Sequence, residues 1–211
     1  LVVEKQAGKN EGGEADLLWI NGENFRTCKR NRLLFGPFAD KLPNQKFVNV
    51  DRASVRNDFG EPVEGLESPY GSAQVVMAYD TARMPAPPAT MGALLTWIRE
   101  HPGKFTYPAP PDFTGSVFVR HVFYHTAGDV ESWQGDFDEK KFEEAAAKTY
   151  QTLRELAPFL WREGQTYPES PVRLAQLFAD GEVDFAISYN PSDASKKIHD
   201  GLYPETVRTF V

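Results

Sequence analysis

Polar and aromatic side chains occur at several predicted strand ends and helix starts, where they could hold a small ligand. At the first of these places Trp19 offers a flat ring face, Asn21 and Glu23 offer polar groups, and Gly22 allows a tight backbone turn. A ring face beside a carboxylate suits a small organic cation. The alternative is that Trp19 belongs to the core and that Asn21 and Gly22 form a plain turn.

The second place is the start of a predicted helix, at Asp112, Phe113, Thr114, Gly115 and Ser116. Free backbone amides, hydroxyl groups and the positive end of the helix dipole can hold a carboxylate, phosphate or sulfate there. The alternative is a helix N-cap formed by Asp112 or Thr114, without a ligand. A proline-rich approach favours the anion site, because it would hold the amides in place before an anion arrives.

The third place follows a predicted strand at 183–189, where Tyr189 and Asn190 precede another helix start. Tyr70, just before a predicted strand at 73–79, is a further candidate. Ligands of open α/β sheets bind outside the carboxyl ends of the strands. We therefore expect these groups to face the same ligand site as the helix start described above.

Motifs of the common enzyme families are absent from the sequence, including G-x-G-x-x-G, the Walker loop, G-x-S-x-G and H-E-x-x-H. His121 and His125 could share one helix face, but no third metal ligand follows at a useful spacing. We predict no catalytic residue, no metal site and no cofactor. Two alternatives stay open, namely a phosphate-handling transferase that uses the helix start at 113–116, and an interaction module without a small-molecule site.

The overall charge restricts the class of partner. The 211 residues include 23 basic and 30 acidic side chains, which gives a net charge of −7. Such a surface repels phosphate backbones and anionic membranes, so we expect no nucleic-acid partner. The longest apolar runs are only about five or six residues, against roughly 20 for a membrane-spanning helix. Cys28 stands alone and can form no disulfide within the sequence.

The elements that must position these groups alternate between strands and helices. This alternation predicts an α/β architecture with mainly parallel strands, while the Gly-, Pro- and Asn-rich residues 35–70 predict long ordered loops. The predicted strands are 17–20, 73–79, 104–107, 183–189 and 206–211. The predicted helices are 1–10, one that starts near Glu23, 90–100, one that follows 112–116, 138–161, 171–179 and 190–201. Thr90 is predicted to cap the helix that runs through Glu100, and Ser170 to start the helix whose first position is Pro171.

Several longer stretches carry a family resemblance. They are residues 16–25 (DLLWINGENF), 34–38 (LFGPF), 69–71 (PYG), 107–116 (YPAPPDFTGS) and 178–191 (FADGEVDFAISYNP). Together they resemble an uncharacterised family of bacterial ABC-transporter periplasmic solute-binding proteins, and the similarity runs across nearly all of the chain. The resemblance also implies that the chain is a fragment of a longer protein.

The resemblance implies the type II periplasmic-binding fold, in which two α/β lobes joined by crossing strands enclose a ligand cleft. Residues 1–78 would belong to the first lobe, 79–84 to a hinge crossing, 85–202 to the second lobe and 203–211 to a return crossing. Binding would close the two lobes about their hinges.

The function that the resemblance implies is that of the extracytoplasmic solute-binding component of an ABC importer, located in the periplasm or on the extracellular, membrane-associated face of a bacterium. Such a protein captures a small ligand, delivers it to the membrane permease and catalyses no reaction. Relatives of this fold carry thiamine, polyamines, iron, sulfate or sugars. The aromatic and acidic candidates suit an organic cation, and the helix start at 113–116 suits a phosphate or carboxylate. A thiamine-like compound combines both features.

Overall fold

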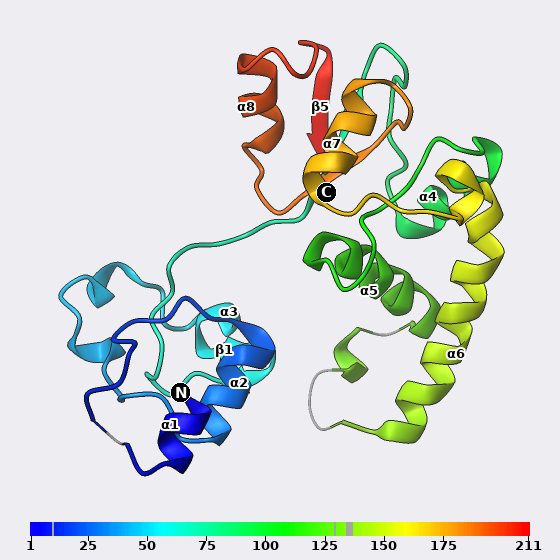
Figure 1. Ribbon diagram of the computed structural model, residues 1–211. Coiled ribbons are helices and arrows are strands. Elements are labelled where there is room, and N and C mark those ends of the chain that lie inside the picture. The colour runs from blue at the N-terminus through cyan, green and yellow to red at the C-terminus, as the bar shows by residue number, and fades with distance from the viewer. Residues whose placement is uncertain (10, 129, 134–136) are drawn as a thin grey trace. The chain divides into compact units, whose positions relative to one another are not determined.

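The computed structural model describes residues 1–9, 11–128, 130–133 and 137–211. They form two compact units, Leu1–Ser72 and Ala73–Val211 (Figure 1). The first unit consists of short helical segments, a small hairpin and loops. Loops make up much of residues 35–70, as predicted, but the prediction missed short helical segments and the hairpin in that stretch. Its elements are α1 (Val2–Gln6), α2 (Gly22–Arg30), η1 (Ala39–Lys41), η2 (Gln45–Phe47), α3 (Ala53–Arg56), β1 (Asn57–Asp58) and β2 (Glu61–Pro62). Asn10, the end of the first predicted helix, lies outside the described residues.

The buried strand predicted at 17–20 is wrong. These residues form no strand, and Leu17 and Trp19 are 89% and 80% exposed. A strand that is buried on both faces needs neighbouring strands and covering helices. Among the described residues of this unit the only strands are β1 and β2, which pair with each other. The apolar run therefore lies at the surface, and Trp19 does not belong to the core.

The second unit is built on an antiparallel sheet of order β4-β3-β5. Its central strand is β3 (Val76–Asp80), which runs against both β4 (Ala186–Ser188) and β5 (Val207–Phe210). The prediction of mainly parallel strands is therefore wrong for this sheet. Strand–helix alternation gives parallel neighbours only if each helix returns the chain to an adjacent strand in the same direction. Here several helices lie between β3 and β4, and the chain re-enters the sheet in the opposite direction.

The segment predicted as a strand at 104–107 joins no ladder; Lys104 is exposed, and residues 105–107 are buried. Phe105 and Thr106 are fully buried. The carbonyl of Lys104 accepts a hydrogen bond from the Asp184 N–H at 2.9 Å, and that of Phe105 accepts one from the Trp161 N–H at 2.8 Å. Hydrogen bonds to separate segments replace the sheet pairing and fix this segment in the core.

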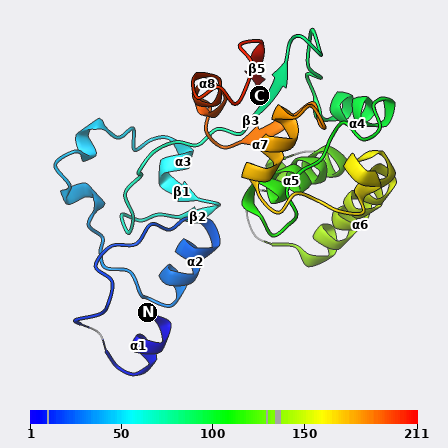
Figure 2. The same ribbon diagram turned by 45° about the horizontal axis from the view of Figure 1, so that its top comes forward.

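Helices surround the sheet of the second unit, and their starts follow the predicted caps. Thr90 Oγ1 accepts a hydrogen bond from the Ala93 N–H at 3.1 Å, and Ser170 Oγ accepts one from the Arg173 N–H at 3.2 Å. Figures 1 and 2 show α5 and α6 packed side by side. The helical elements are α4 (Met91–Glu100), α5 (Phe113–Ala127), η3 (Glu131–Trp133), α6 (Glu139–Leu156), η4 (Ala157–Phe159), η5 (Trp161–Gly164), α7 (Pro171–Ala179) and α8 (Asp193–His199).

Aromatic side chains hold the core of this unit together. The ring of Phe185, which is fully buried, lies 4.9 Å from that of Trp97 on α4 and 6.0 Å from those of Phe105 and Phe210, between centroids. A single ring thus joins a helix, the buried segment around Phe105 and β5. The ring of Phe105 also lies 5.0 Å from that of Phe118, between centroids, so α5 packs on the same centre.

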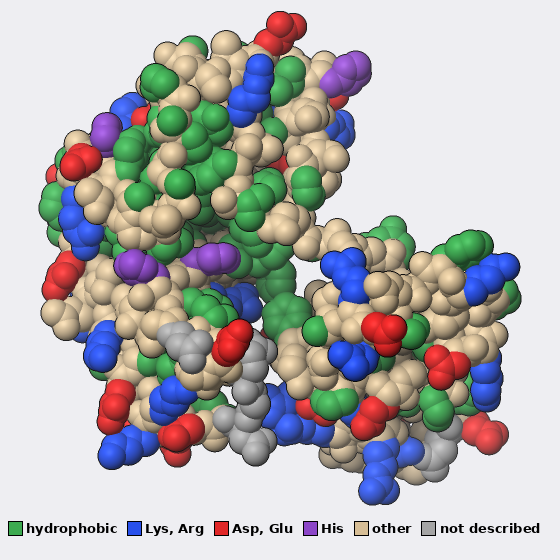
Figure 3. All heavy atoms as spheres, turned by 180° about the vertical axis from the view of Figure 1, so that it is seen from behind, with side chains coloured by type: hydrophobic (Ala, Val, Ile, Leu, Met, Phe, Trp, Pro, Cys, Tyr) green, Lys and Arg blue, Asp and Glu red, His purple; other side chains and the backbone are tan. Residues whose placement is uncertain are grey.

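Charged side chains of both signs are interspersed over the face seen in Figure 3. No large area of a single sign stands out there, and the net charge is negative. Within the described ranges, no helix combines the length and apolar character needed to cross a membrane.

Candidate functional site

The start of α5 is pressed against the backbone of the segment before it. A side chain on Gly115 would overlap the Pro108 carbonyl oxygen and lie 2.8 Å from its carbonyl carbon. The preceding segment is itself fixed, because the Ala109 N–H donates to the Pro168 carbonyl at 2.8 Å. Only glycine permits this approach, so the local sequence sets the position of the first turn of α5 closely.

The Asp112 side chain caps this helix. Its Oδ1 accepts hydrogen bonds from the N–H groups of Thr114 at 2.8 Å and Gly115 at 3.1 Å. The Ser116 N–H donates to the Asp112 carbonyl at 2.8 Å. The amides predicted to hold an anion therefore already have partners, and a carboxylate already faces the positive end of the helix. The geometry here is that of the N-cap alternative.

Two of the predicted places meet in the second unit. The rings of Phe113 on α5 and Tyr189 after β4 lie 4.9 Å apart between centroids, and the Tyr189 hydroxyl donates to the Phe113 carbonyl at 3.4 Å. Phe113 is 46% exposed and Tyr189 is half-buried. Asn190 follows in a turn, where its Oδ1 accepts from the Ser192 N–H at 2.9 Å. The two rings present a partly exposed aromatic surface.

Arg120 adds a positive charge to this aromatic pair, and the sequence analysis missed it. Its guanidinium carbon lies 5.5 Å from the centroid of the Phe113 ring. Burial raises the pKa of the Tyr189 hydroxyl, Arg120 opposes this shift, and Asp112 adds to it. Tyr189 is therefore a neutral donor at physiological pH. The sequence spacing could have identified Arg120, because it follows Phe113 by seven positions and residues seven apart lie on one face of a helix.

The first and fourth predicted places meet in the first unit. The rings of Trp19 and Tyr70 lie 4.5 Å apart between centroids, tilted by 45°, and they are 80% and 85% exposed. Asn21 and Glu23, at the start of α2, are also exposed. Exposed paired rings can receive a flat or cationic group.

Two partly buried carboxyl groups of the first unit were also missed. Asp58 Oδ2 accepts a hydrogen bond from the N–H of Gly22, whose φ of +55° favours glycine. Burial raises the pKa of Asp58, and this hydrogen bond opposes the shift. Burial and the nearby charge of Asp58 raise the pKa of Glu67 to about 7. Both residues lie in the loop-rich stretch, where no periodic pattern marks which side chains are buried.

Glu67 is expected to make the stability of the protein depend on pH. Its pKa is about 7 in the folded state against 4.5 without the fold. The contribution is therefore fully present below pH 4.5 and is lost as the pH rises through 7. Because the group is partly exposed, we expect a loss of only about 1 kcal/mol in the free energy of unfolding.

NMR titration of the Glu67 side-chain carboxyl would measure this pKa directly, and urea unfolding at several pH values would measure the stability. Glu67→Gln should flatten the pH dependence, whereas Glu14→Gln, at an exposed position, should leave it unchanged. A Glu67 titration midpoint near that of an ordinary glutamate would show that its burial has no electrostatic effect.

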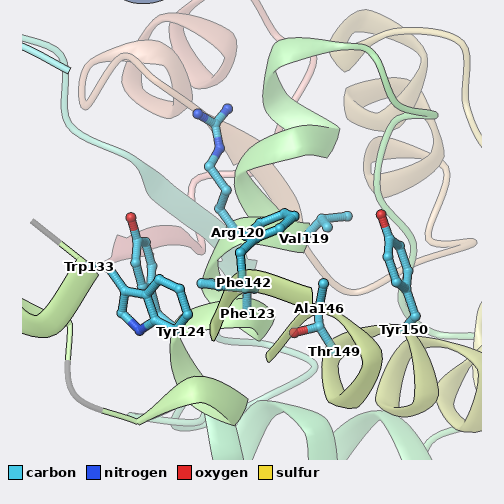
Figure 4. A pocket seen from close by; sticks show the side chains of 9 residues that line it. All are labelled: Val119, Arg120, Phe123, Tyr124, Trp133, Phe142, Ala146, Thr149 and Tyr150. Atoms are coloured by element: carbon cyan, nitrogen blue, oxygen red, sulfur yellow. The ribbon is translucent and has the colours of Figure 1, made fainter. Parts of the chain in front are cut away.

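An aromatic cavity of about 340 Å³ lies between α5, η3 and α6 (Figure 4). The hydroxyl of Thr149 at this cavity donates to the Ala145 carbonyl at 2.9 Å and is therefore satisfied. Arg120 is the charged member of the lining, and its guanidinium extends away from Ala146 and Thr149 (Figure 4). No other predicted or missed site residue lines the cavity. The lining consists of Val119, Arg120, Phe123, Tyr124, Trp133, Phe142, Ala146, Thr149 and Tyr150.

The histidine pair on α5 shows no metal-ligand geometry. His121 Nδ1 lies 2.7 Å from the Val117 carbonyl of its own helix. Over the described part of the chain, no three His, Cys, Asp or Glu side chains are grouped so that they could hold a metal ion.

Comparison with known proteins gives the family. Residues 1–201 match the family described as bacterial extracellular solute-binding protein. The chain is 40% identical over 208 residues to "Protein YnjB" of Escherichia coli (strain K12), and this alignment covers 99% of the chain but 53% of YnjB. The chain thus spans about half the length of that relative. The match extends over nearly all of the sequence, and the chain belongs to the family of bacterial extracellular solute-binding proteins.

Proposed function

We propose that the protein is the solute-binding component of an ABC importer, which captures a small organic solute in the bacterial periplasm and delivers it to a membrane permease. Membership of a solute-binding family supports this proposal. The structural observation that carries it is the contact between Phe113 and Tyr189, because two partly exposed rings meet there from separate elements. Partly exposed rings with polar neighbours are typical of small-molecule sites.

We propose the two-lobe organisation of the type II fold for the whole protein. The first lobe would include residues 1–78 and the second 85–202, with crossings at 79–84 and 203–211. The pairing of β3 with β5 supports these crossings, because Tyr79 and Asp80 of the first crossing pair with Arg208 and Val207 of the second in one antiparallel ladder. The compact units divide slightly earlier, at Ser72, and β3 belongs to the second unit.

The proposed ligand contacts form one cluster in each unit. In the first unit, Trp19 and Tyr70 would stack on the solute, and Asn21 and Glu23 would contact its polar or positive groups. In the second unit the rings of the aromatic pair would contact the solute. The helix start, residues 112–116, would hold Phe113 in place within this cluster, and the next residues, Thr114 and Gly115, are buried. The other groups proposed for the cluster are Asp112, Ser116, Tyr189 and Asn190. A thiamine-like compound remains one candidate solute.

The enzyme alternative has less support than solute binding. A transferase that holds phosphate at the helix start would need the N–H groups of Thr114 and Gly115, and both already donate to Asp112. Families of solute-binding proteins typically bind their ligand without transforming it. Mass spectrometry of a solute recovered after incubation with the protein separates the two functions, because a transferase would return a changed solute.

Trp19→Ala should weaken solute binding about tenfold or more, because a lost stacking face costs about 1–2 kcal/mol. Isothermal titration calorimetry would measure the affinity, with a solute chosen by its stabilising effect on the wild-type protein. Phe47→Ala is the matched control in the same unit, because Phe47 is 78% exposed and belongs to no proposed contact. Equal affinities of wild type and Trp19→Ala would show that Trp19 does not contact the solute. They would not contradict the contacts proposed for the second cluster.

A further inference from the structure

We propose that Arg120 is the anion-recognising group of the second cluster, so that the bound solute carries a carboxylate or a phosphate beside a flat ring. This inference rests on the proposed solute-binding function and names the ligand chemistry of that site. In this proposal the Arg120 side chain on α5 binds the anion, instead of the backbone amides at the start of that helix.

The geometry of Arg120 leaves most of its donors available. Its Nε–H donates to the Ser116 carbonyl at 3.3 Å, which fixes the guanidinium beside the first turn of α5. The guanidinium carbon lies 5.5 Å from the Phe113 ring centroid. Across the described ranges, neither Nη1 nor Nη2 of Arg120 has a hydrogen-bond partner, and no carboxylate lies within ion-pair distance. A planar guanidinium with both terminal nitrogens free can bind a carboxylate or phosphate with two parallel hydrogen bonds.

Arg83 in the same unit shows how a structural arginine is satisfied. Its guanidinium lies 3.6 Å from a carboxylate oxygen of Asp80 and 3.7 Å from one of Asp184. It therefore has two counter-ions, whereas Arg120 has none within the described residues. The nearest acidic residue of the cluster, Asp112, uses Oδ1 to cap the helix. A partly exposed cation that is fixed beside the Phe113 ring and has no counter-ion among the described residues can bind an external anion.

The aromatic pair defines the rest of the ligand. Phe113 and Tyr189 are tilted by 34° and partly exposed, so a flat ring can pack against the exposed part of the pair. An anionic group attached to that ring would then lie close to the Arg120 nitrogens. Inorganic anions without a ring would use the charge alone, in competition with water, and would bind more weakly.

The test compares small probes that differ in their charge and in whether they carry an aromatic ring. Benzoate and phenyl phosphate carry a ring and an anion, benzyl alcohol a ring alone, benzylamine a ring and a cation, and acetate and inorganic phosphate an anion alone. We expect calorimetry to show at least tenfold tighter binding for the ring-bearing anions than for the other four, because a charge-assisted bidentate contact is worth that much. The ratio of the affinities for benzoate and phenyl phosphate indicates which anion the site prefers.

Arg120→Met removes the charge but keeps an unbranched stem against the aromatic cavity, so the packing there should survive. It should weaken binding of the ring-bearing anions at least tenfold, and Arg120→Lys should give an intermediate loss. Arg154→Met is the control, because Arg154 is exposed on α6. Circular dichroism would verify that each variant is folded, and if Arg120→Met unfolds then Arg120→Lys alone is compared.

Three outcomes separate the inference from the function on which it rests. Unchanged affinity of the Arg120 variants for the ring-bearing anions, or for any solute found by screening, overturns the inference and leaves solute binding standing. Preference for benzylamine or benzyl alcohol overturns it as well and points to a cationic or neutral solute. If no small solute binds the wild-type protein at all, the proposed function itself fails.

Discussion

Gly115→Ala is expected to lower the free energy of unfolding by about 3 kcal/mol, or to prevent folding altogether. The new methyl group would overlap the Pro108 carbonyl, and neither side can yield easily. On one side is the first turn of α5, and on the other is a segment whose Ala109 N–H is bonded to the Pro168 carbonyl. Relief of the overlap would move α5 away from this segment and carry Phe113 with it. Urea unfolding followed by circular dichroism would measure the loss.

Gly92→Ala provides the control for this substitution. A methyl group there would lie 3.2 Å from the edge of the His125 ring, which is an exposed side chain that can rotate. Its effect should stay within about 1 kcal/mol, because alanine is also the better helix former. If Gly115→Ala were as mild as Gly92→Ala, the close approach of α5 to Pro108 would be refuted.

Phe185→Ala should cost about 4 kcal/mol of unfolding free energy, since it removes a fully buried ring and leaves a cavity. The lost contacts are those with Trp97, Phe105 and Phe210. Phe185→Leu should cost much less, about 1 kcal/mol, because most of the apolar volume is kept. Thermal and urea unfolding of the two variants would give the comparison.

Phe47→Ala should cost less than about 0.5 kcal/mol, because this ring is 78% exposed. Equal losses for Phe185→Ala and Phe47→Ala would show that the aromatic centre of the second unit does not stabilise the fold.

Local signals in the sequence predicted the helices well. Thr90 and Ser170 were identified as caps from residue type and spacing, and both accept the expected N–H at the start of a helix. Asp112 was one of two residues named for the N-cap alternative at α5, and it accepts two. These features depend on residues within a few positions of each other, which the sequence displays directly.

Features that depend on distant partners were predicted less well. The apolar run at 17–20 looks like a buried strand, but no described strand pairs with it and it is exposed. Whether β4 runs parallel or antiparallel to β3 depends on how the chain returns after α7, which periodicity does not record. Contacts such as that between Phe113 and Tyr189 join residues 76 positions apart, and only the assumption of a shared sheet edge predicted them.

The electrostatic features of the protein were the hardest to predict from the sequence. Arg120 lies on a helix with an ordinary apolar stripe, and its lack of a counter-ion appears only when the surrounding residues are placed. Glu67 has a pKa of about 7 because of burial beside Asp58, and neither residue occurs in a pattern that signals burial. Desolvation and neighbouring charges are properties of the folded state.

Small-solute binding is the central claim, and a thermal-shift screen of the protein against thiamine, spermidine, glucose, sulfate and benzoate tests it most directly. A solute present at a hundred times its dissociation constant adds about 2.7 kcal/mol to the stability, which is readily seen as a higher melting temperature. We predict that an organic solute with a ring raises the melting temperature and is recovered chemically unchanged. The same melting temperature with every solute, or recovery of a transformed solute, would contradict the account.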